Sequence, residues 1–582
     1  MKAHSYYPKL LVLLALSFLI SCQSEKKQSI QEINVRLSKD PLKINPVFNP
    51  SSSAREVFQY IFAPLADFHP ETQELIPILI DEIPEKQLIQ EGPFKGDDLY
   101  KVNIRQEAKW SDGSDITADD FVFTYKSIML PQSNTLAWRS YLDCIKNIKT
   151  DLNNPKYIEI IVEDEYMLGK EAVLTMYILQ KSKYDPLDIM SKTKFEDFEK
   201  DTEWMESDSQ FIQFAKAFNS PTFSRDSVNN TGPYTLESWV TNQSIVLKRK
   251  ENYWGASDVE NPFLQAGSER MIFKIIPDEN TAINALKDGQ LDVLSLKSSR
   301  NFLELSQDTL MLENFNFFSP QQYSYYYIAM NNRKPGLSDK KVRKALAHAL
   351  EVNSIINTVD QGFGTRTVGH FNPAKSYYAN NIEANAYDIT KSNKLLSEAG
   401  WADTNDNGIK DKIIDGQLTE LEFDIIISGS QLTEGIAVLF KESLKDIGVS
   451  LNIVRKKYSI MRKEDIATRS FDMAAMAVTQ DVAPDDPFPR WHSDSDIPGG
   501  NNFVGYNSSE ADELIESIRE ESDQTVRKER YIELQEQMHE DQPVIFLYSP
   551  KLKIVINNSY ESSASSRRPG YMANTFYLKS GQ

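Results

Sequence analysis

Two hydrophobic periodicities alternate along this 582-residue chain, and they restrict its fold more than any other feature. Residues 31–38 (QEINVRLS) and 99–106 (LYKVNIRQ) alternate apolar and polar side chains, as half-buried strands do. Residues 53–65 instead place Val57, Tyr60, Ile61 and Leu65 on one helical face. The mixture predicts an α/β (mixed α+β) protein. The length exceeds what one hydrophobic core organises, so we expect two or three domains.

Several predicted helices carry signals at both ends. An N-cap residue precedes the apolar pattern and a glycine ends it, in three segments: from Asp278 or Asn280 to Gly289, from Ser338 or Asp339 to Gly362, and from Asp388 to Gly400. Near the C-terminus, Ser509 and Asp512 form a capping-box-like start to a further helix. Residues 543–549 and 552–557 are predicted to form a final pair of strands.

The N-terminus has the pattern of an export signal. Lys2 and Lys9 form a basic region that precedes an apolar run at 10–20, and this run is far too short to span a membrane. The run ends at Ser21 before Cys22 and resembles a bacterial lipoprotein signal, in which that cysteine carries the lipid. We expect a signal peptide at 1–21, lipidation of Cys22 and a polar tether at 22–30. The alternative is a signal cut elsewhere, with an incidental cysteine.

One other cysteine, Cys144, remains once Cys22 is lipidated, so no intramolecular disulfide can form. We expect Cys144 to be a small buried side chain. The 84 acidic residues outnumber the 64 basic ones, and a net charge of −20 repels nucleic-acid phosphates. No nucleic-acid partner is expected.

Two acidic segments have the composition of an active or metal site. At 109–127, a turn is followed by Thr117 and Asp120 at capping-box spacing, which favours a structural role for these aspartates. At 403–411, the segment copies the first half of a calcium loop, but Ile414 stands where the bidentate glutamate is required. A tight loop is the favoured interpretation there, and bound calcium the alternative.

Enzyme motifs are not found in the sequence. The six histidines form no HExxH pair, Ser430 does not lie in a GxSxG elbow, and the glycines from Gly362 have the wrong spacing for a dinucleotide loop. We therefore expect no enzyme, no metal and no cofactor. A triad assembled from distant residues stays open, because its members need only meet in space.

Taken in order, many segments resemble one family over almost the whole mature chain. These segments are 42–50, 57–82, 102–126, 229–255, 284–293, 325–350, 394–401, 502–515 and 527–548. Together they are similar to the solute-binding proteins of peptide-type ABC importers, the oligopeptide- and dipeptide-binding proteins of bacterial extracellular solute-binding protein family 5. The ordered set carries the resemblance, since each segment alone is weak.

The resemblance implies a two-lobed, periplasmic-binding-protein-like clamp with an additional domain. By analogy, lobe I comprises residues 31–70, 228–325 and 545–582, the additional domain 71–227, and lobe II 326–544. The family implies a monomer in the cell envelope or periplasm. Such a protein captures an oligopeptide between its lobes and delivers it to the permease subunits of an ABC transporter.

The resemblance also implies the site. The family's ligand adds as an extended strand, and its free amine pairs with an aspartate after a short strand of lobe II. Here this is Asp481, with Thr479 and Gln480 as backbone partners. Asp485 is a rival, because the following loop is longer than the family's, and a loop-capping role is the alternative for Asp481.

Weaker candidates for the wall of the site are Phe48, Asn49 and Trp491, which packing alone would explain equally well. The segment 422–428 is not followed by the arginine with which dipeptide binders hold a ligand carboxylate, so strict dipeptide specificity is not expected.

The same clamp is also compatible with other functions. Family members bind nickel complexes, haem or oligosaccharides. An exported peptide or glycan hydrolase and a sensory lipoprotein without a transporter are two further alternatives.

Overall fold

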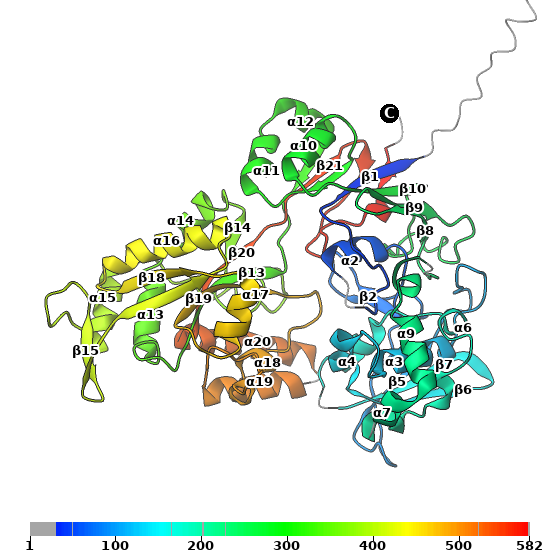
Figure 1. Ribbon diagram of the computed structural model, residues 1–582, viewed down its shortest axis with the longest axis horizontal. Coiled ribbons are helices and arrows are strands. Elements are labelled where there is room, and N and C mark those ends of the chain that lie inside the picture. The colour runs from blue at the N-terminus through cyan, green and yellow to red at the C-terminus, as the bar shows by residue number, and fades with distance from the viewer. Residues whose placement is uncertain are drawn as a thin grey trace, which may run out of the picture.

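The computed structural model describes residues 31–48, 51–164, 166–200, 203–226, 229–521 and 523–579. Cys22 and Asn49 therefore lie outside the described residues. Within the described ranges, no helix is both long and apolar enough to cross a membrane. Two large mixed sheets and a smaller antiparallel one organise the chain (Figure 1).

Lobe I is built on the seven-stranded sheet. Its central strand β1 pairs in parallel with β10 and β11, and the remaining neighbours are antiparallel. In spatial order the strands are β12 (Phe315–Phe318), β21 (Ile554–Asn557), β11 (Val293–Ser295), β1 (Glu32–Leu37), β10 (Arg270–Ile275), β9 (Ser244–Arg249) and β8 (Tyr234–Val240). The helices of this lobe are α2 (Ser52–Phe58), α10 (Glu279–Lys287), α11 (Ser299–Ser306) and α12 (Thr309–Asn314).

The additional domain lies beside lobe I (Figure 1). The two share one hydrophobic cluster, which contains Ile33 and Phe273 of lobe I together with Phe121 and Phe218 of the additional domain. Its sheet has the strand order β4 (Gln87–Leu88), β5 (Asp98–Asn103), β7 (Asn154–Val162) and β6 (Ile145–Asp151). Its helices are α3 (Ala118–Met129), α4 (Leu136–Leu142), α5 (Gly169–Leu174), α6 (Lys181–Tyr184), α7 (Glu196–Lys200), α8 (Glu203–Ser207) and α9 (Ser209–Phe218). Cys144 is buried here as expected, and burial raises the pKa of its thiol to about 12.

Lobe II has a six-stranded sheet with a separate hydrophobic cluster on each face. The spatial order is β14 (Gly364–Arg366), β20 (Val544–Pro550), β13 (Ser324–Met330), β19 (Met473–Thr479), β17 (Glu422–Ile427) and β18 (Ser450–Arg455). One face contacts α13 (Lys340–His348), α14 (Val352–Thr358), α15 (Ile389–Glu398) and α16 (Gln431–Lys445). The other face contacts α18 (Phe488–Trp491), α19 (Ser509–Glu520) and α20 (Gln524–Asp541). The short α17 (Tyr458–Ile460) follows β18 in the chain.

Three two-stranded ribbons complete the chain. They are β2 (Ala66–Phe68) with β3 (Leu75–Pro77), β15 (Asp411–Ile414) with β16 (Gln417–Glu420), and β22 (Tyr560–Glu561) with β23 (Tyr577–Leu578).

The chain passes between the two large sheets through residues 319–323 and 551–553, which join β12 to β13 and β20 to β21. The prediction that the last two strands pair with each other was wrong, because β20 belongs to lobe II and β21 to lobe I. For the same reason, residues 545–550 lie in the sheet of lobe II and not in lobe I. Both strands are buried almost throughout, and an apolar run shows that a strand is buried but not which sheet buries it.

Most predicted helix ends are confirmed. Asp278, Asp339 and Asp388 are N-caps, and Gly289 and Gly400 take the left-handed backbone expected of a stop. The single helix expected from Asp339 to Gly362 is instead two, α13 and α14, because the backbone at Glu351 is not helical. The start of α19 was predicted one residue late, since Ser508 accepts the bond from Ala511 N.

Candidate functional site

The end of β19 gathers three of the predicted site residues, Thr479, Gln480 and Asp481. This strand pairs with β13 over its whole length, from Met473 to Thr479. Its other edge pairs with β17 only at Met473 and Ala474. From Ala475 to Thr479, that edge is therefore free of any strand of the described chain.

The register fixes which backbone groups face this free edge. Gln480 N donates to Tyr323 O at 3.0 Å, so these two residues form a hydrogen-bonded pair of the antiparallel ladder. Such pairs alternate with residues whose N–H and C=O point the other way. The peptide groups of Ala475, Ala477 and Thr479 therefore point to the open edge. Ala477 and Thr479 are exposed, whereas Gln480 is buried.

Asp481 follows this edge and is exposed. Its Oδ1 accepts one bond, from Val482 N at 2.8 Å, and its other oxygen has no partner among the described residues. Val482 packs with Tyr323 and with Phe68 of lobe I, in a small apolar cluster that also contacts Leu75. The loop of Asp481 thus lies where the two lobes meet.

Lys375 binds the backbone of this loop. This role was not predicted from the sequence. The Lys375 ammonium donates to the carbonyls of Asp481 (2.6 Å), Val482 (3.0 Å) and Ala483 (2.5 Å). The same nitrogen lies 3.7 Å from Asp485 Oδ2, and the two side chains are 2% and 12% exposed. Burial lowers the pKa of Lys375, and the Asp485 carboxylate opposes that shift. A lysine in the aromatic segment 371–378 was the available signal, since a buried lysine needs partners.

Asp485 makes its contacts inside lobe II. Burial raises its pKa, and Lys375 and the Tyr377 hydroxyl, which donates to Oδ2 at 2.9 Å, act against that shift. The Tyr531 hydroxyl donates to the Asp485 carbonyl at 2.5 Å. The two rival aspartates thus differ: Asp481 faces outward with an unused oxygen, and Asp485 has an internal cation and a donor.

The structure places the weaker candidates in hydrophobic cores. Phe48 lies 4.9 Å from Phe218, measured between ring centroids, in the core shared by lobe I and the additional domain. Trp491 packs between His370 and Phe546 inside lobe II. Neither is brought to the end of β19.

The two acidic segments form turns and caps. Thr117 and Asp120 make the predicted capping box at the start of α3, and Asp120 also accepts from Trp110 Nε1 at 3.1 Å. In the second segment, Asp403 accepts backbone bonds from Asn407 N (3.2 Å) and Gly408 N (2.9 Å). In the described part of the chain, no three His, Cys, Asp or Glu side chains are grouped to hold a metal ion.

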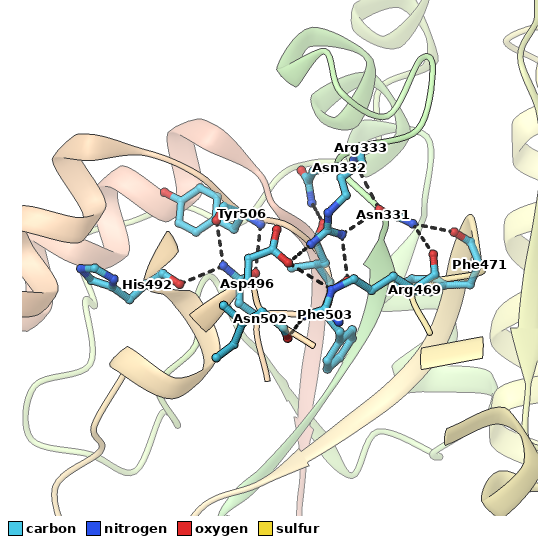
Figure 2. Close-up of polar contacts among 12 residues, drawn as sticks. Asn331, Asn332, Arg333, Arg469, Phe471, His492, Asp496, Asn502, Phe503 and Tyr506 are labelled. Carbon is cyan, nitrogen blue, oxygen red and sulfur yellow. Dashed lines mark hydrogen bonds and ion pairs between the residues drawn. The ribbon is translucent and has the colours of Figure 1, made fainter. Parts of the chain in front are cut away.

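A cavity of about 680 Å³ lies at the opposite end of β13, lined by Asn332, Arg343, Tyr506 and Asp541 among others. Figure 2 shows the polar contacts beside it, where Asn331 and Asn332 follow β13 and Asn502 donates to the carbonyls of His492 and Tyr506. A seven-residue strand of about 3.4 Å per residue separates this cavity from Asp481. It is not part of the site at β19.

Known proteins share both sequence and fold with this chain. Residues 85–499 match the model of bacterial extracellular solute-binding proteins, family 5, middle region. The oligopeptide-binding protein AppA of Bacillus subtilis is 27% identical over 469 residues, which cover 79% of this chain and 77% of that protein. The periplasmic oligopeptide-binding protein OppA of Salmonella typhimurium is 24% identical over 88% of this chain and 84% of its own length.

The solved structure of Bacillus subtilis AppA in complex with a nonapeptide superposes with a TM-score of 0.66 at 23% identity, over 94% of this chain and 99% of that one. Relatives named for other ligands also match. Haem-binding protein A of Haemophilus influenzae is 25% identical over 54% of this chain and 53% of that protein. The nickel-binding periplasmic protein of Escherichia coli is 27% identical over 39% of this chain and 42% of that protein. Proteins of this family bind solutes and are not enzymes. The family match over residues 85–499, the mixed two-lobed fold and the ordered sequence segments together establish that this chain belongs to family 5 of the bacterial extracellular solute-binding proteins.

Proposed function

We propose that this protein captures oligopeptides between its lobes and delivers them to an ABC importer. The observation that carries the proposal is the free edge of β19 from Ala475 to Thr479, which leads directly to Asp481. An extended peptide adds to such an edge through its main chain, which all peptides share. Two relatives named for oligopeptides support the same ligand class.

The peptide amine binds Asp481 in this proposal. An ammonium bound by a carboxylate makes a charge-assisted hydrogen bond that an acetylated amine cannot form. Asp481 has an unused oxygen for this bond, whereas Asp485 is occupied by Lys375 and Tyr377. Asp485 acts by balancing the charge of Lys375, which fixes the loop that presents Asp481.

A calorimetric titration of the purified chain tests both steps. A free-amine tetra-alanine peptide should bind, and its N-acetylated form should bind more weakly by about 2–5 kcal/mol, with Asp481→Asn removing the difference. Asp485→Asn serves as the comparison, because it removes the rival carboxylate and keeps that of Asp481. Equal binding of both peptides by the wild-type protein would remove Asp481 from the site.

Two alternatives are tested with the same preparation. Haem and a nickel complex are the probes suggested by the names of two relatives, and preferential binding of either would replace peptides as the ligand class. A hydrolase would convert a bound peptide to shorter products, which mass spectrometry detects.

The protein acts as a monomer anchored by a lipid on Cys22 in this proposal, on the exported side of the membrane. The signal-like segment at 10–20 and the following cysteine support the anchor. Cys22→Ser should move the protein from the membrane fraction to the soluble fraction of cells. An unchanged membrane fraction would refute lipid anchoring at Cys22.

A further inference from the structure

Arg568 lies beside the proposed amine site. Its Nη2 donates to Tyr323 O at 3.3 Å, the same carbonyl that accepts from Gln480 N at 3.0 Å. Gln480 directly precedes Asp481, so the guanidinium and the carboxylate flank one residue of the loop. They nevertheless form no ion pair with each other among the contacts of the described residues.

The neighbouring arginine, Arg567, differs from Arg568 because it has a carboxylate partner. Arg567 pairs with Asp67 Oδ2 at 2.6 Å and donates to Gln59 Oε1 at 3.1 Å. Arg568 has a single carbonyl partner and no carboxylate in the part of the chain that the structure describes. Burial lowers the pKa of Arg568, the charge of Asp481 opposes this shift, and the charge of Arg55 adds to it. A partly buried guanidinium in this situation is stabilised by any anion that reaches it.

A second cation, Arg55, is close enough for its charge to lower the pKa of Arg568. It is exposed on α2 of lobe I and has no ion pair among the described residues. Once a ligand ammonium occupies Asp481, the two arginines keep positive charge that the described chain does not neutralise. A carboxylate on the ligand can neutralise that charge.

We propose that Arg568 and Arg55 form a carboxylate subsite beside Asp481, and that the protein prefers peptides carrying a carboxylate within one or two residues of their free amine. This inference rests on the proposed peptide function and deepens it. Each residue of an extended peptide advances the chain by at most about 3.3–3.6 Å. A carboxylate one or two residues from the amine therefore stays close to Asp481, where Arg568 lies. The carboxylate is either the C-terminus of a very short peptide or an acidic side chain near the amino end.

Two pairs of peptides distinguish these sources in calorimetric titrations of the full chain. The first pair is Ala-Ala as free acid and as C-terminal amide. The second is Ala-Asp-Ala-Ala-amide and Ala-Asn-Ala-Ala-amide. In at least one pair, the member with the carboxylate should bind at least about tenfold more tightly, because a hydrogen bond to a charged group is lost in the other. The responding pair identifies the source.

Arg568→Gln should bring that ratio to about one while the preference for a free over an acetylated amine persists. Arg55→Gln, an exposed substitution, should reduce the ratio and keeps the test valid if the Arg568 variant fails to fold. Arg300→Gln, an exposed arginine elsewhere in lobe I, is the matched control and should keep the full ratio.

A ratio near one in both pairs for the wild-type protein, with amine dependence intact, would overturn the carboxylate subsite and leave peptide binding standing. If no free-amine peptide binds at all, the proposed function fails and the subsite fails with it.

Discussion

Replacing Lys375 by methionine should both destabilise the protein and weaken peptide binding. Methionine has similar length but leaves three loop carbonyls without their donor and the Asp485 carboxylate, 12% exposed, without its cation. Removing one partner of a buried ion pair costs about 3–5 kcal/mol, since the other charge stays desolvated. We expect the free energy of unfolding to fall by about that amount, and free-amine peptides to bind more weakly because the Asp481 loop loses its support.

The pH dependence follows from the same contacts. Lys375 lowers the pKa of Asp485 against the larger effect of burial, so the pKa of Asp485 should rise further in the variant. A carboxyl whose folded pKa lies above its unfolded value stabilises the fold below the unfolded pKa, and that contribution is lost as pH rises through the folded pKa. The deficit of Lys375→Met should therefore grow as the pH is raised from about 4.

Urea unfolding at several pH values, followed by fluorescence, measures these effects. The double variant Lys375→Met/Asp485→Leu should recover part of the loss, because both charges are then gone. Lys394→Met removes an exposed ion pair with Glu398 and should cost less than about 1 kcal/mol. If Lys375→Met lost no more than this control, or bound free-amine peptides as the wild type does, the supporting role of Lys375 would be refuted.

Three further predictions concern the edge strand, a helix cap and a buried carboxyl. Ala477→Pro should abolish peptide binding with little change in the unfolding midpoint, because the Ala477 N–H faces the open edge. Val478→Pro should instead unfold lobe II, because it breaks the ladder with β13. Equal peptide binding by Ala477→Pro and the wild type would contradict main-chain addition. Thr117→Ala should lower the free energy of unfolding by about 0.5–2 kcal/mol through loss of the capping box of α3, and an unchanged urea midpoint would show that Asp120 alone supports the helix. Burial raises the pKa of Glu56 from 4.5 to about 7, so the free energy of unfolding should fall by up to about 1.4 kcal/mol per pH unit between pH 4.5 and 7. Glu56→Gln should remove that pH dependence. An unchanged pH dependence in the variant would assign it to other groups.

Several elements were predictable because their determinants lie within a few residues of each other. The Thr117–Asp120 box, the Asp278 and Asp388 caps, and the stops at Gly289 and Gly400 need only one turn of chain to form. The family resemblance is likewise a property of the sequence, and the family match at residues 85–499 confirms it. Asp481 was identified as a candidate because it follows a recognisable strand.

The tertiary structure decided everything that depends on which distant segments meet. Both β20 and β21 are apolar, buried strands, yet they belong to different lobes. Only the sheet register shows that the backbone N–H and C=O groups of Ala475, Ala477 and Thr479 face an open edge. Lys375 and Arg568 are 106 and 87 positions from Asp481 by their numbers in the chain, and no local pattern links them to it. Local structure follows from hydrogen bonds within a turn, whereas the neighbours of a charge follow from how whole sheets and lobes pack. The sequence by itself thus determined the local elements and the family, and the packing of the lobes decided the surroundings of Asp481.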